Sequence, residues 1–387
     1  MSDLATRCRP LGEHGGPQCT AQGLGAASFG DRFELLPNEA ALGAVEMAWQ
    51  QGLRFFDTAP WYGKGLAEHR LGMGLYGKPR GEFVLQTKVG RYLRPARSDE
   101  EAASPAPWGG EGAGPFAIEF DYSYGAVLEQ HQHSLQRMGT HRIDSLVIHD
   151  IEGSGIRGPG VVDSGKSVDE HLDELFHPEF GGFKALQTLR RSGAISAFGA
   201  GINGGSEDPA TRAWNREYCL RLANATGPND RPIDFFLLAE GFTLLNHYFF
   251  EDGILDLCLE RGIGIVVGGP QNSGLLAKAD PNMEYAHAYP APADRLEKAK
   301  LLHDICAQHG VSLMAAALQF PLAHPATTAV IPGGKNAEEV EQCVAAMNAP
   351  IPKGLWAALR AADLIPARMP LPVGAAEMIA VGATPRL

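Results

Sequence analysis

Residues 53–88 read LRFFDTAPWYGKGLAEHRLGMGLYGKPRGEFVLQTK, and this stretch decides the fold that we predict. An apolar strand over 53–57 is followed by a turn with Pro60 and Gly63, a helix, and a second apolar strand over 83–88. Parallel strands joined by a helix place the polar groups that follow their carboxyl ends at one edge of the sheet. The sequence therefore predicts an α/β protein with its chemistry at that edge.

The same alternation of short apolar segments and amphipathic helices continues along the chain. The eight strand candidates are residues 23–28, 53–57, 83–88, 144–149, 195–199, 233–239, 264–268 and 328–331. Strands that are apolar throughout and alternate with helices are typical of a closed parallel (β/α)8 TIM barrel, with an open doubly wound sheet as the alternative. We expect one domain over residues 1–387, with a core of about 20–365 and a tail of 366–387.

Two connections are longer than a barrel requires: residues 91–120 after the third strand and 151–181 after the fourth. Both would overhang the edge that carries the chemistry, so we interpret them as walls of a substrate pocket. Trp61 and Trp108 are candidate substrate-binding residues, because their rings could stack on a sugar or a pyridine. For the first loop, an insertion without function is the alternative.

Asp57, Tyr62 and Lys88 lie at or just beyond the ends of two of these strands, and His149 ends another. A phenol with a pKa near ~10 is a poor acid or base at neutral pH unless a cation lowers that pKa. Lys88 can supply the cation, and Asp57 can hold it in place. Each residue alone is more often structural, but together they predict a site for proton transfer.

The chain resembles the aldo-keto reductases in three runs: FDTAPWYGKGLAE, TKVGR and DYSYGAVLEQHQHSLQRMGTHRIDSLVIHD. The likeness extends from GLGAASFG at Gly23 to IPGGKNAEEVEQC at Ile331 and is closer to bacterial dehydrogenases of L-fucose, D-threo-aldoses and pyridoxal. It implies a TIM barrel with a nicotinamide cofactor. It also implies that Asp57, Tyr62, Lys88 and His149 are catalytic and that His149 binds the substrate by orienting its oxygen.

A cofactor is expected because a phenol moves protons but cannot accept a hydride. Residues 199–204 form a literal G-x-G-x-x-G, but they follow the fifth strand of a barrel pattern, which argues against a Rossmann turn. The resemblance instead assigns Asn203 to the nicotinamide carboxamide. Gly268 departs from the family pattern, because many relatives carry an aromatic ring there. The remaining cofactor-binding residues that the resemblance implies are Gly268, Pro270, Asn272, Ser273, Leu275, Gly333, Gly334, Lys335, Glu339 and Gln342.

The helix that opens after the eighth strand offers free backbone N–H groups to a phosphate. Relatives that prefer NADPH carry Arg where this chain has Glu339, and usually Asn where it has Cys343. A carboxylate would repel a 2′-phosphate and could accept a hydrogen bond from a ribose hydroxyl. We therefore expect NAD, with NADP as the less favoured cofactor.

The resemblance favours NAD-dependent oxidation of the anomeric hydroxyl of an aldose to its lactone, with Tyr62 removing the proton. The alternatives in the same class are pyridoxal 4-dehydrogenase activity and general aldehyde or ketone reduction. In a different class, the barrel would bind the cofactor as a sensor without turnover. The complete set of proton-transfer groups favours the enzyme.

Composition restricts the partners. A net charge of −12 and a pI near 5.5, without a basic run, argue against nucleic acid or an anionic membrane. No apolar stretch reaches about 18 residues, so we expect neither a membrane span nor a signal peptide. Six cysteines without ligand spacing, and His131 and His133 on different helix faces, predict no metal site. We expect a cytoplasmic enzyme with a small-molecule substrate; the sequence does not indicate an oligomeric state.

Overall fold

The computed structural model describes residues 3–32, 34–104, 113–151, 165–204, 206–225, 231–278, 284–285 and 289–372. Its main sheet contains eight strands in the order β14-β11-β10-β9-β8-β5-β4-β3, and every neighbouring pair is parallel. The sheet closes where Gly23 N donates to Val330 O (2.9 Å) and Gly25 N donates to Pro332 O (3.0 Å). The predicted TIM barrel is confirmed, and the open sheet is wrong.

The barrel strands overlap all eight predicted segments. They are β3 (Leu24–Gly25), β4 (Phe55–Asp57), β5 (Val84–Val89), β8 (Ser145–Ile148), β9 (Ala197–Asn203), β10 (Phe235–Ala239), β11 (Gly264–Gly268) and β14 (Thr327–Ile331). Strand β9 extends beyond its predicted end and includes most of the glycine run. A Cβ atom on Gly199 would lie 2.6 Å from the Phe235 ring, so glycine there permits close packing of neighbouring strands.

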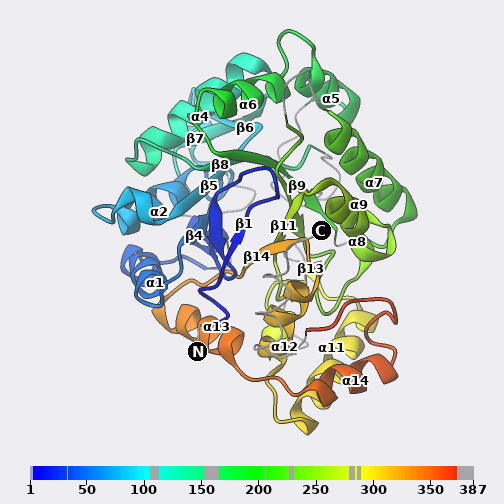
Figure 1. Cartoon of the computed structure of the whole chain (residues 1–387). Coiled ribbons are helices and arrows are strands. Elements are labelled where there is room, and N and C mark those ends of the chain that lie inside the picture. The colour runs from blue at the N-terminus through cyan, green and yellow to red at the C-terminus, as the bar shows by residue number, and fades with distance from the viewer. Residues whose placement is uncertain are drawn as a thin grey trace.

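Helices surround the barrel, which Figure 1 shows along its axis. The longer ones are α1 (Asn38–Gln50), α2 (Leu66–Leu75), α4 (Tyr124–Met138), α5 (Val168–Phe176), α6 (Gly182–Arg191), α7 (Pro209–Asn224), α9 (Ile254–Arg261), α11 (Ala293–Gln308), α12 (Leu313–Gln319), α13 (Ala337–Asn348) and α14 (Lys353–Ala361). Short helical turns are α3 (Asp99–Ala102), α8 (Tyr248–Glu251), α10 (Leu275–Lys278), η1 (Ala27–Gly30), η2 (Arg80–Glu82) and η3 (Phe320–Ala323).

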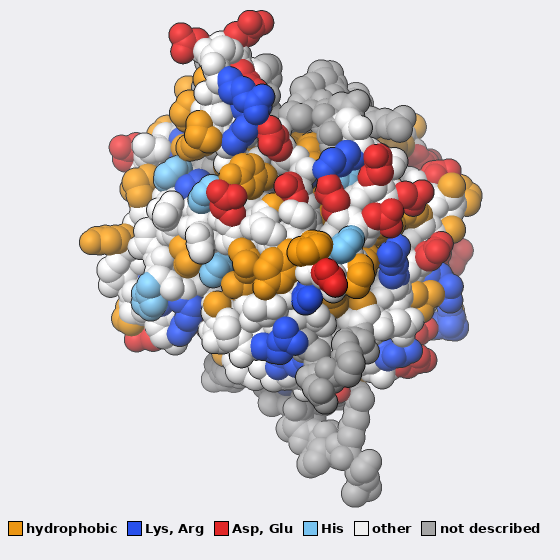
Figure 2. Space-filling model, turned by 90° about the horizontal axis from the view of Figure 1, so that it is seen from above, with side chains coloured by type: hydrophobic (Ala, Val, Ile, Leu, Met, Phe, Trp, Pro, Cys, Tyr) orange, Lys and Arg blue, Asp and Glu red, His pale blue; other side chains and the backbone are white. Residues whose placement is uncertain are grey.

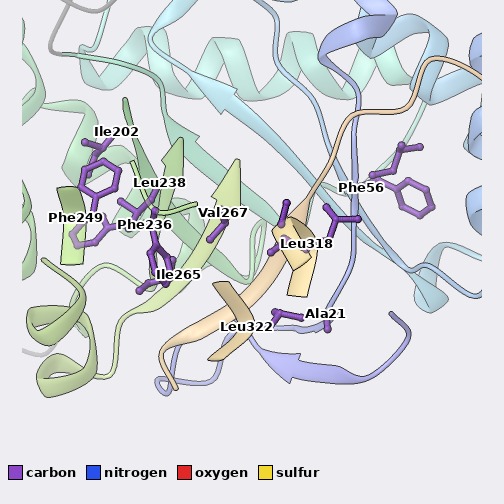
Figure 3. Packing of buried hydrophobic residues seen from close by; sticks show 14 of the residues in the cluster. Ala21, Phe56, Ile202, Phe236, Leu238, Phe249, Ile265, Val267, Leu318 and Leu322 are labelled. Atoms are coloured by element: carbon purple, nitrogen blue, oxygen red, sulfur yellow. The ribbon is translucent and has the colours of Figure 1, made fainter. Parts of the chain in front are cut away.

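The hydrophobic core has two layers because successive strand residues point to opposite faces. Phe236 and Leu238 of β10 point outward and pack with Ile265 and Phe249 between the sheet and the helices (Figure 3). Phe235 and Leu237 of the same strand belong instead to the cluster inside the barrel. Complete burial of each such side chain stabilises the fold by about 1.5–3 kcal/mol, so the alternation within one strand anchors both layers.

Two antiparallel hairpins were not predicted. The first, β1 (Cys8–Pro10) with β2 (Gln18–Thr20), lies over the centre of the strand ring in Figure 1 and places Leu11 and Cys19 in the inner cluster. The second, β6 (Arg91–Pro95) with β7 (Phe116–Phe120), occupies both ends of the connection expected to be a long loop. In the other long connection, α5 occupies part of the described portion, while residues 152–164 lie outside the described ranges.

A further antiparallel pair joins β12 (Glu284–Tyr285) to β13 (Tyr289–Pro290). The N-cap of α1 is Pro37, and the side chain of Asn38 accepts a hydrogen bond from Arg70 Nε at 2.9 Å. On the face that Figure 2 shows, acidic and basic side chains are interspersed. None of the helices in the described ranges is long and apolar enough to cross a membrane.

Candidate active site

Asp57 and Lys88 form a buried ion pair at the carboxyl ends of β4 and β5. Lys88 Nζ lies 2.9 and 2.8 Å from the two carboxylate oxygens of Asp57 and donates to Thr58 O at 2.9 Å. Gln86, directly opposite Asp57 in the parallel ladder, donates to the same carboxylate at 2.7 Å. These contacts fix both the position and the direction of the ammonium group.

Tyr62 is placed by a close approach of two backbone segments. A Cβ atom on Gly30 would lie 2.5 Å from both Tyr62 C and Gly63 N, and Gly63 itself has φ of 61°. A side chain at either glycine would push the turn away from η1. The absence of a side chain at these glycines therefore allows the turn to place the Tyr62 phenol at the mouth of the barrel.

Lys88 also hydrogen-bonds to the Tyr62 hydroxyl, and its Nζ lies 5.0 Å from the centre of the phenol ring. Burial raises the pKa of Tyr62 above its ordinary value, and the Lys88 charge offsets this only in part. The expectation that Lys88 gives this phenol a lowered pKa is therefore wrong, because removing a phenolate from water costs more than one neighbouring ammonium returns. Burial also acts to lower the pKa of Lys88, but Asp57 and Tyr62 outweigh it and raise that pKa.

His149 follows β8 and faces Tyr62, with ring centres 6.0 Å apart and planes at 86°. Its backbone N donates to Val89 O at 2.9 Å, and its backbone O accepts from Tyr122 Oη at 2.7 Å. Burial, together with the charges of Arg91 and Lys88, holds the pKa of His149 well below its usual range. The imidazole is therefore neutral near pH 7. The structure thus brings together all four residues predicted to be catalytic.

Arg91 and Asp150 were missed, although both stand in the runs that carried the family resemblance. Asp150 Oδ2 lies 3.3 Å from His149 Nε2 and 3.8 Å from Arg91 Nη2. Burial raises the pKa of Asp150, while Arg91 and a hydrogen bond with the Asn203 side chain act in the opposite direction. A charged residue directly after a strand-end histidine was the sequence signal that could have found this pair.

The predicted substrate-binding residues have different outcomes. Trp61 is only 1% exposed and lies beneath the β6–β7 hairpin, packed with Leu93 and Ile118. The Arg91 guanidinium lies 4.6 Å from its ring centre. Trp61 therefore does not offer an open face for stacking, because the unpredicted hairpin covers it. Trp108 lies outside the described residues.

Asn203 and the turn after β11 contain features that fit a polar ligand. Asn203 ends β9 beside Asp150, and the turn contains positive φ values at Gly269 (58°), Asn272 (48°) and Ser273 (54°). Asn272 is completely buried, yet neither amide atom of its side chain has a hydrogen-bond partner among the residues described. Such an amide is costly unless a bound group completes its hydrogen bonds.

Other predicted cofactor residues shape this turn. Ser273 Oγ donates to Glu240 Oε1 at 3.1 Å, Leu275 is buried, and Pro270 is also buried. A Cβ atom on Gly268 would lie 3.0 Å from Leu237 Cδ2, so a larger side chain there would require Leu237 to move. Glycine at this position therefore suits the packing of β11 against Leu237 of β10.

Glu339 belongs to the cap of α13. Its carboxylate accepts from Lys335 N at 3.0 Å and lies 3.6 Å from Lys335 Nζ, which also lies 2.6 Å from Glu34. Lys335 therefore offsets part of the repulsion expected from Glu339. Gly333 bridges to Gly25 at barrel closure. The two other predicted residues contact neighbours within the segment: a Cβ on Gly334 would lie 2.8 Å from Val340 Cγ2, and Gln342 Nε2 donates to Glu338 at 3.1 Å.

A cavity of about 230 Å³ lies at the other end of the barrel, between the β1–β2 hairpin and the start of β14. Its lining includes Arg7, Arg9, Cys258 and Thr327 but none of the candidate catalytic side chains.

No group of three or more His, Cys, Asp or Glu side chains in the described ranges is placed to hold a metal ion.

The barrel carries three features at its strand ends: a buried Asp–Lys pair, a tyrosine bonded to that lysine, and a neutral histidine. Together they define a class of TIM-barrel enzymes for proton-coupled chemistry at carbon. The chain matches the Aldo/keto reductase family over residues 22–364 and belongs to that family. It is accordingly an NAD(P)-dependent oxidoreductase, as the dehydrogenase names of its curated relatives also support.

Two curated relatives match nearly the whole chain. It is 35% identical to a pyridoxal 4-dehydrogenase from Microbacterium luteolum, covering 93% of this chain and 98% of the relative. It is 34% identical to a D-threo-aldose 1-dehydrogenase from a Pseudomonas species, covering 92% and 98%. Among solved structures, the holo form of an aldo-keto reductase from Bacillus halodurans has a TM-score of 0.63 at 22% identity, with 94% and 98% covered. This last likeness concerns the fold.

Proposed function

We propose that the protein oxidises the anomeric hydroxyl of a cyclic aldose to a lactone, with NAD as the cofactor. The observation that carries the proposal is the Lys88 ammonium, fixed by Asp57 and hydrogen-bonded to Tyr62 beside a neutral His149. This arrangement can take a proton from a hydroxyl group as the carbon is oxidised. The D-threo-aldose 1-dehydrogenase relative supports an aldose as the substrate.

In the proposed mechanism, the ionised Tyr62 accepts the hydroxyl proton while Lys88 stabilises the phenolate. Asp57 keeps the ammonium aimed at the phenol, and His149 orients the substrate oxygen. The Lys88 charge acts against the burial that raises the pKa of Tyr62, so its contribution is largest when the phenol is ionised. When bound, a nicotinamide cofactor supplies the hydride acceptor that the side chains lack.

For the cofactor, we propose that Asn203 hydrogen-bonds to the carboxamide and that Asn272, Ser273 and Leu275 line the pyrophosphate groove. The buried amide of Asn272 supports this assignment, because it requires polar partners. Near the adenosine ribose we place Gly333, Gly334, Lys335, Glu339 and Gln342. The carboxylate of Glu339 favours NAD, although Lys335 reduces the margin over NADP.

A second candidate substrate is pyridoxal in its hemiacetal form. The pyridoxal 4-dehydrogenase relative supports this substrate. The proton and hydride transfers are the same as for an aldose, because a hemiacetal also presents a hydroxyl group on the carbon that is oxidised. The two candidates differ in the ring that the rest of the pocket must accommodate.

The decisive experiment incubates the purified protein with NAD or NADP and either L-fucose, other D-threo-aldoses or pyridoxal, and follows reduced cofactor and lactone. We expect lactone formation from an aldose with NAD, and loss of that signal in Tyr62→Phe. Lactone formation from pyridoxal alone would select the second candidate. Tight cofactor binding without oxidation of any of these substrates would reject both.

A further inference from the structure

Asp150 turns back toward the histidine that precedes it. Successive side chains of an extended strand point to opposite faces, so a residue directly after His149 would ordinarily point away from it. Asp150 instead has φ of 33°, a left-handed conformation that is uncommon outside glycine but tolerated by Asp and Asn. As a result, Asp150 Oδ2 lies 3.3 Å from His149 Nε2.

Arg91 contacts both the backbone carbonyl and the side-chain carboxylate of Asp150. Its Nη2 donates to Asp150 O at 3.1 Å and lies 3.8 Å from the carboxylate. The guanidinium is itself fixed, because its carbon lies 4.6 Å from the ring centre of Trp61 and 4.2 Å from that of Phe120. The side chain of Asn203 also hydrogen-bonds to the Asp150 carboxylate. Groups from two separate strands, Arg91 of β6 and Asn203 of β9, therefore orient this carboxylate.

Among the described residues, Asp150 is the group placed to select the tautomer of His149. Nδ1 is buried and has no hydrogen-bond partner in the part of the chain that the structure describes. The tautomer of a histidine is usually selected by the hydrogen bonds of its ring nitrogens. The Arg91 guanidinium, 3.8 Å from the Asp150 carboxyl group, supports its ionised form. An ionised carboxylate accepts and does not donate, so Asp150 in that form favours a hydrogen atom on Nε2. Burial and the charges of Arg91 and Lys88 lower the pKa of His149, so the ring carries only that one hydrogen.

We propose that Asp150, held by Arg91, is a positioning residue that keeps the hydrogen atom of His149 on Nε2, so that His149 donates to the substrate oxygen and Tyr62 alone accepts the proton. The 3.3 Å contact is longer than the usual range of about 2.7–3.2 Å, so the same N–H can be shared with a substrate oxygen. The role toward substrate rests on the proposed function. The tautomer is a property of the protein without substrate.

The test substitutes Asp150→Asn. Asparagine has nearly the same shape and tolerates the left-handed backbone, but its amide can donate as well as accept, so it no longer enforces a hydrogen atom on Nε2. Nitrogen-15 NMR of the histidine-labelled free protein reports the tautomer directly, and His149→Gln identifies the resonance. We expect the Nε2–H form in the parent and a new Nδ1–H population in Asp150→Asn.

Steady-state kinetics provide the second measurement. Asp150→Asn should lower kcat about 10- to 100-fold, because the hydrogen bond to the reacting oxygen matters most in the transition state. KM should change by less than about threefold. A loss that appeared in KM with kcat unchanged would overturn the role toward the reacting oxygen.

The matched control is Asp144→Asn, at the opposite end of the same strand. Asp144 is also a buried carboxylate with an arginine partner, 2.5 Å from Arg80 Nη2, but it lies away from His149. This variant should leave the His149 tautomer and kcat unchanged, even if it lowers stability. It therefore separates loss of a buried ion pair near β8 from loss of the contact with His149.

Several outcomes would overturn the inference: a hydrogen atom on Nδ1 in the parent, a doubly protonated His149 at neutral pH, or an unchanged tautomer in Asp150→Asn. If Asp150→Asn does not fold, the parent spectrum still decides the tautomer, and Arg91→Lys should shift it in the same direction by weakening the clamp on Asp150. If the parent oxidises neither aldoses nor pyridoxal, the proposed function fails while the NMR result still stands.

Discussion

The two ends of the barrel use buried carboxylates in different ways. At the amino ends of the strands, Asp144 precedes β8 and accepts a hydrogen bond from Leu85 N at 2.8 Å, while Asp234 precedes β10 and accepts from Phe198 N at 2.9 Å. Each carboxylate also lies near two guanidinium groups: Arg80 (2.5 Å) and Arg142 (3.0 Å) for Asp144, and Arg190 (2.8 Å) and Arg231 (3.1 Å) for Asp234.

At the carboxyl ends of the strands, each buried carboxylate contacts a side chain that belongs to the proposed proton-transfer site. Asp57 holds Lys88, which also contacts the Tyr62 hydroxyl, and Asp150 contacts His149. Lys88 and His149 both face the region where a substrate is proposed to bind. At one end the charges join neighbouring strands; at the other they orient groups for proton transfer. Substitutions at the two ends should consequently separate stability from turnover.

The largest combined effect is expected for Lys88→Met. The substitution leaves Asp57 as a buried charge without its cation, which should cost about 3–5 kcal/mol of unfolding free energy. It should also lower kcat by at least about 10²-fold and move the pH optimum upward, because the phenolate loses its stabilising charge. Chemical denaturation and a pH–rate profile test both effects. An unchanged rate would show that the ammonium does not assist Tyr62.

Asp234→Ala should affect stability alone. Removing this carboxylate takes away the ion pair that Arg190 Nη1 makes with it at 2.8 Å and the acceptor of Phe198 N, which should cost about 3–5 kcal/mol in chemical denaturation. At a temperature where the variant is folded, kcat should stay within about twofold of the parent, because the proposed site is at the opposite end of the barrel. A large loss of kcat in the folded variant would contradict the separation of the two ends.

Tyr62→Phe should lower turnover and leave stability nearly unchanged. We expect kcat to fall by at least about 10²-fold, equivalent to about 2.7 kcal/mol of transition-state stabilisation, with little change in cofactor affinity. Unfolding free energy should change by less than about 1 kcal/mol, because only a hydroxyl is lost from a site that retains its Asp–Lys pair. Retention of most of the activity would remove Tyr62 from the proposed mechanism.

Acidification should lower the free energy of unfolding, because each end of the barrel contains a buried neutral histidine. Burial lowers the pKa of His324, which precedes β14, to about 4, and that of His247, which follows β10, to about 3. The unfolded chain takes up protons near pH ~6.5, so unfolding free energy should fall as pH decreases from there through about 4 and 3. Each histidine should lower the free energy of unfolding by about 2 kcal/mol at pH 5.

Denaturation midpoints at pH 8 and pH 5 measure this loss. His324→Asn should reduce the difference between the two pH values, since asparagine does not titrate. The exposed His303 provides the control, because His303→Gln should leave the difference unchanged. A parent protein that is equally stable at pH 5 and pH 8 would contradict the buried neutral state.

The smallest effect is expected for Glu339→Arg, which tests the cofactor proposal. Exchanging the carboxylate for a guanidinium should raise the preference for NADP over NAD by about tenfold, equivalent to about 1.4 kcal/mol. Lys335 limits the change because it already offsets part of the Glu339 charge. Steady-state constants for both cofactors decide the matter. An unchanged ratio would place the adenosine ribose away from Glu339.

The amino-acid sequence alone determined the barrel and the proximity of the candidate catalytic side chains. Apolar segments alternate with helices, and in a parallel barrel every strand presents its carboxyl end on the same side. Asp57, Lys88 and His149 therefore had to converge once three segments were recognised as strands. Local pattern carried this prediction, because periodicity and strand ends can be read without knowing what packs over them.

The three-dimensional structure alone decided the properties that depend on distant parts of the chain. The β6–β7 hairpin covers Trp61, which sequence suggested as a stacking surface. Burial raises the pKa of Tyr62, which a charge argument from Lys88 alone predicted would fall. Arg91 reaches Asp150, 59 positions away, and the left-handed backbone there turns a carboxylate toward His149. Exclusion of water and contacts between distant segments set these properties, and neither is encoded in the spacing of residues along a strand.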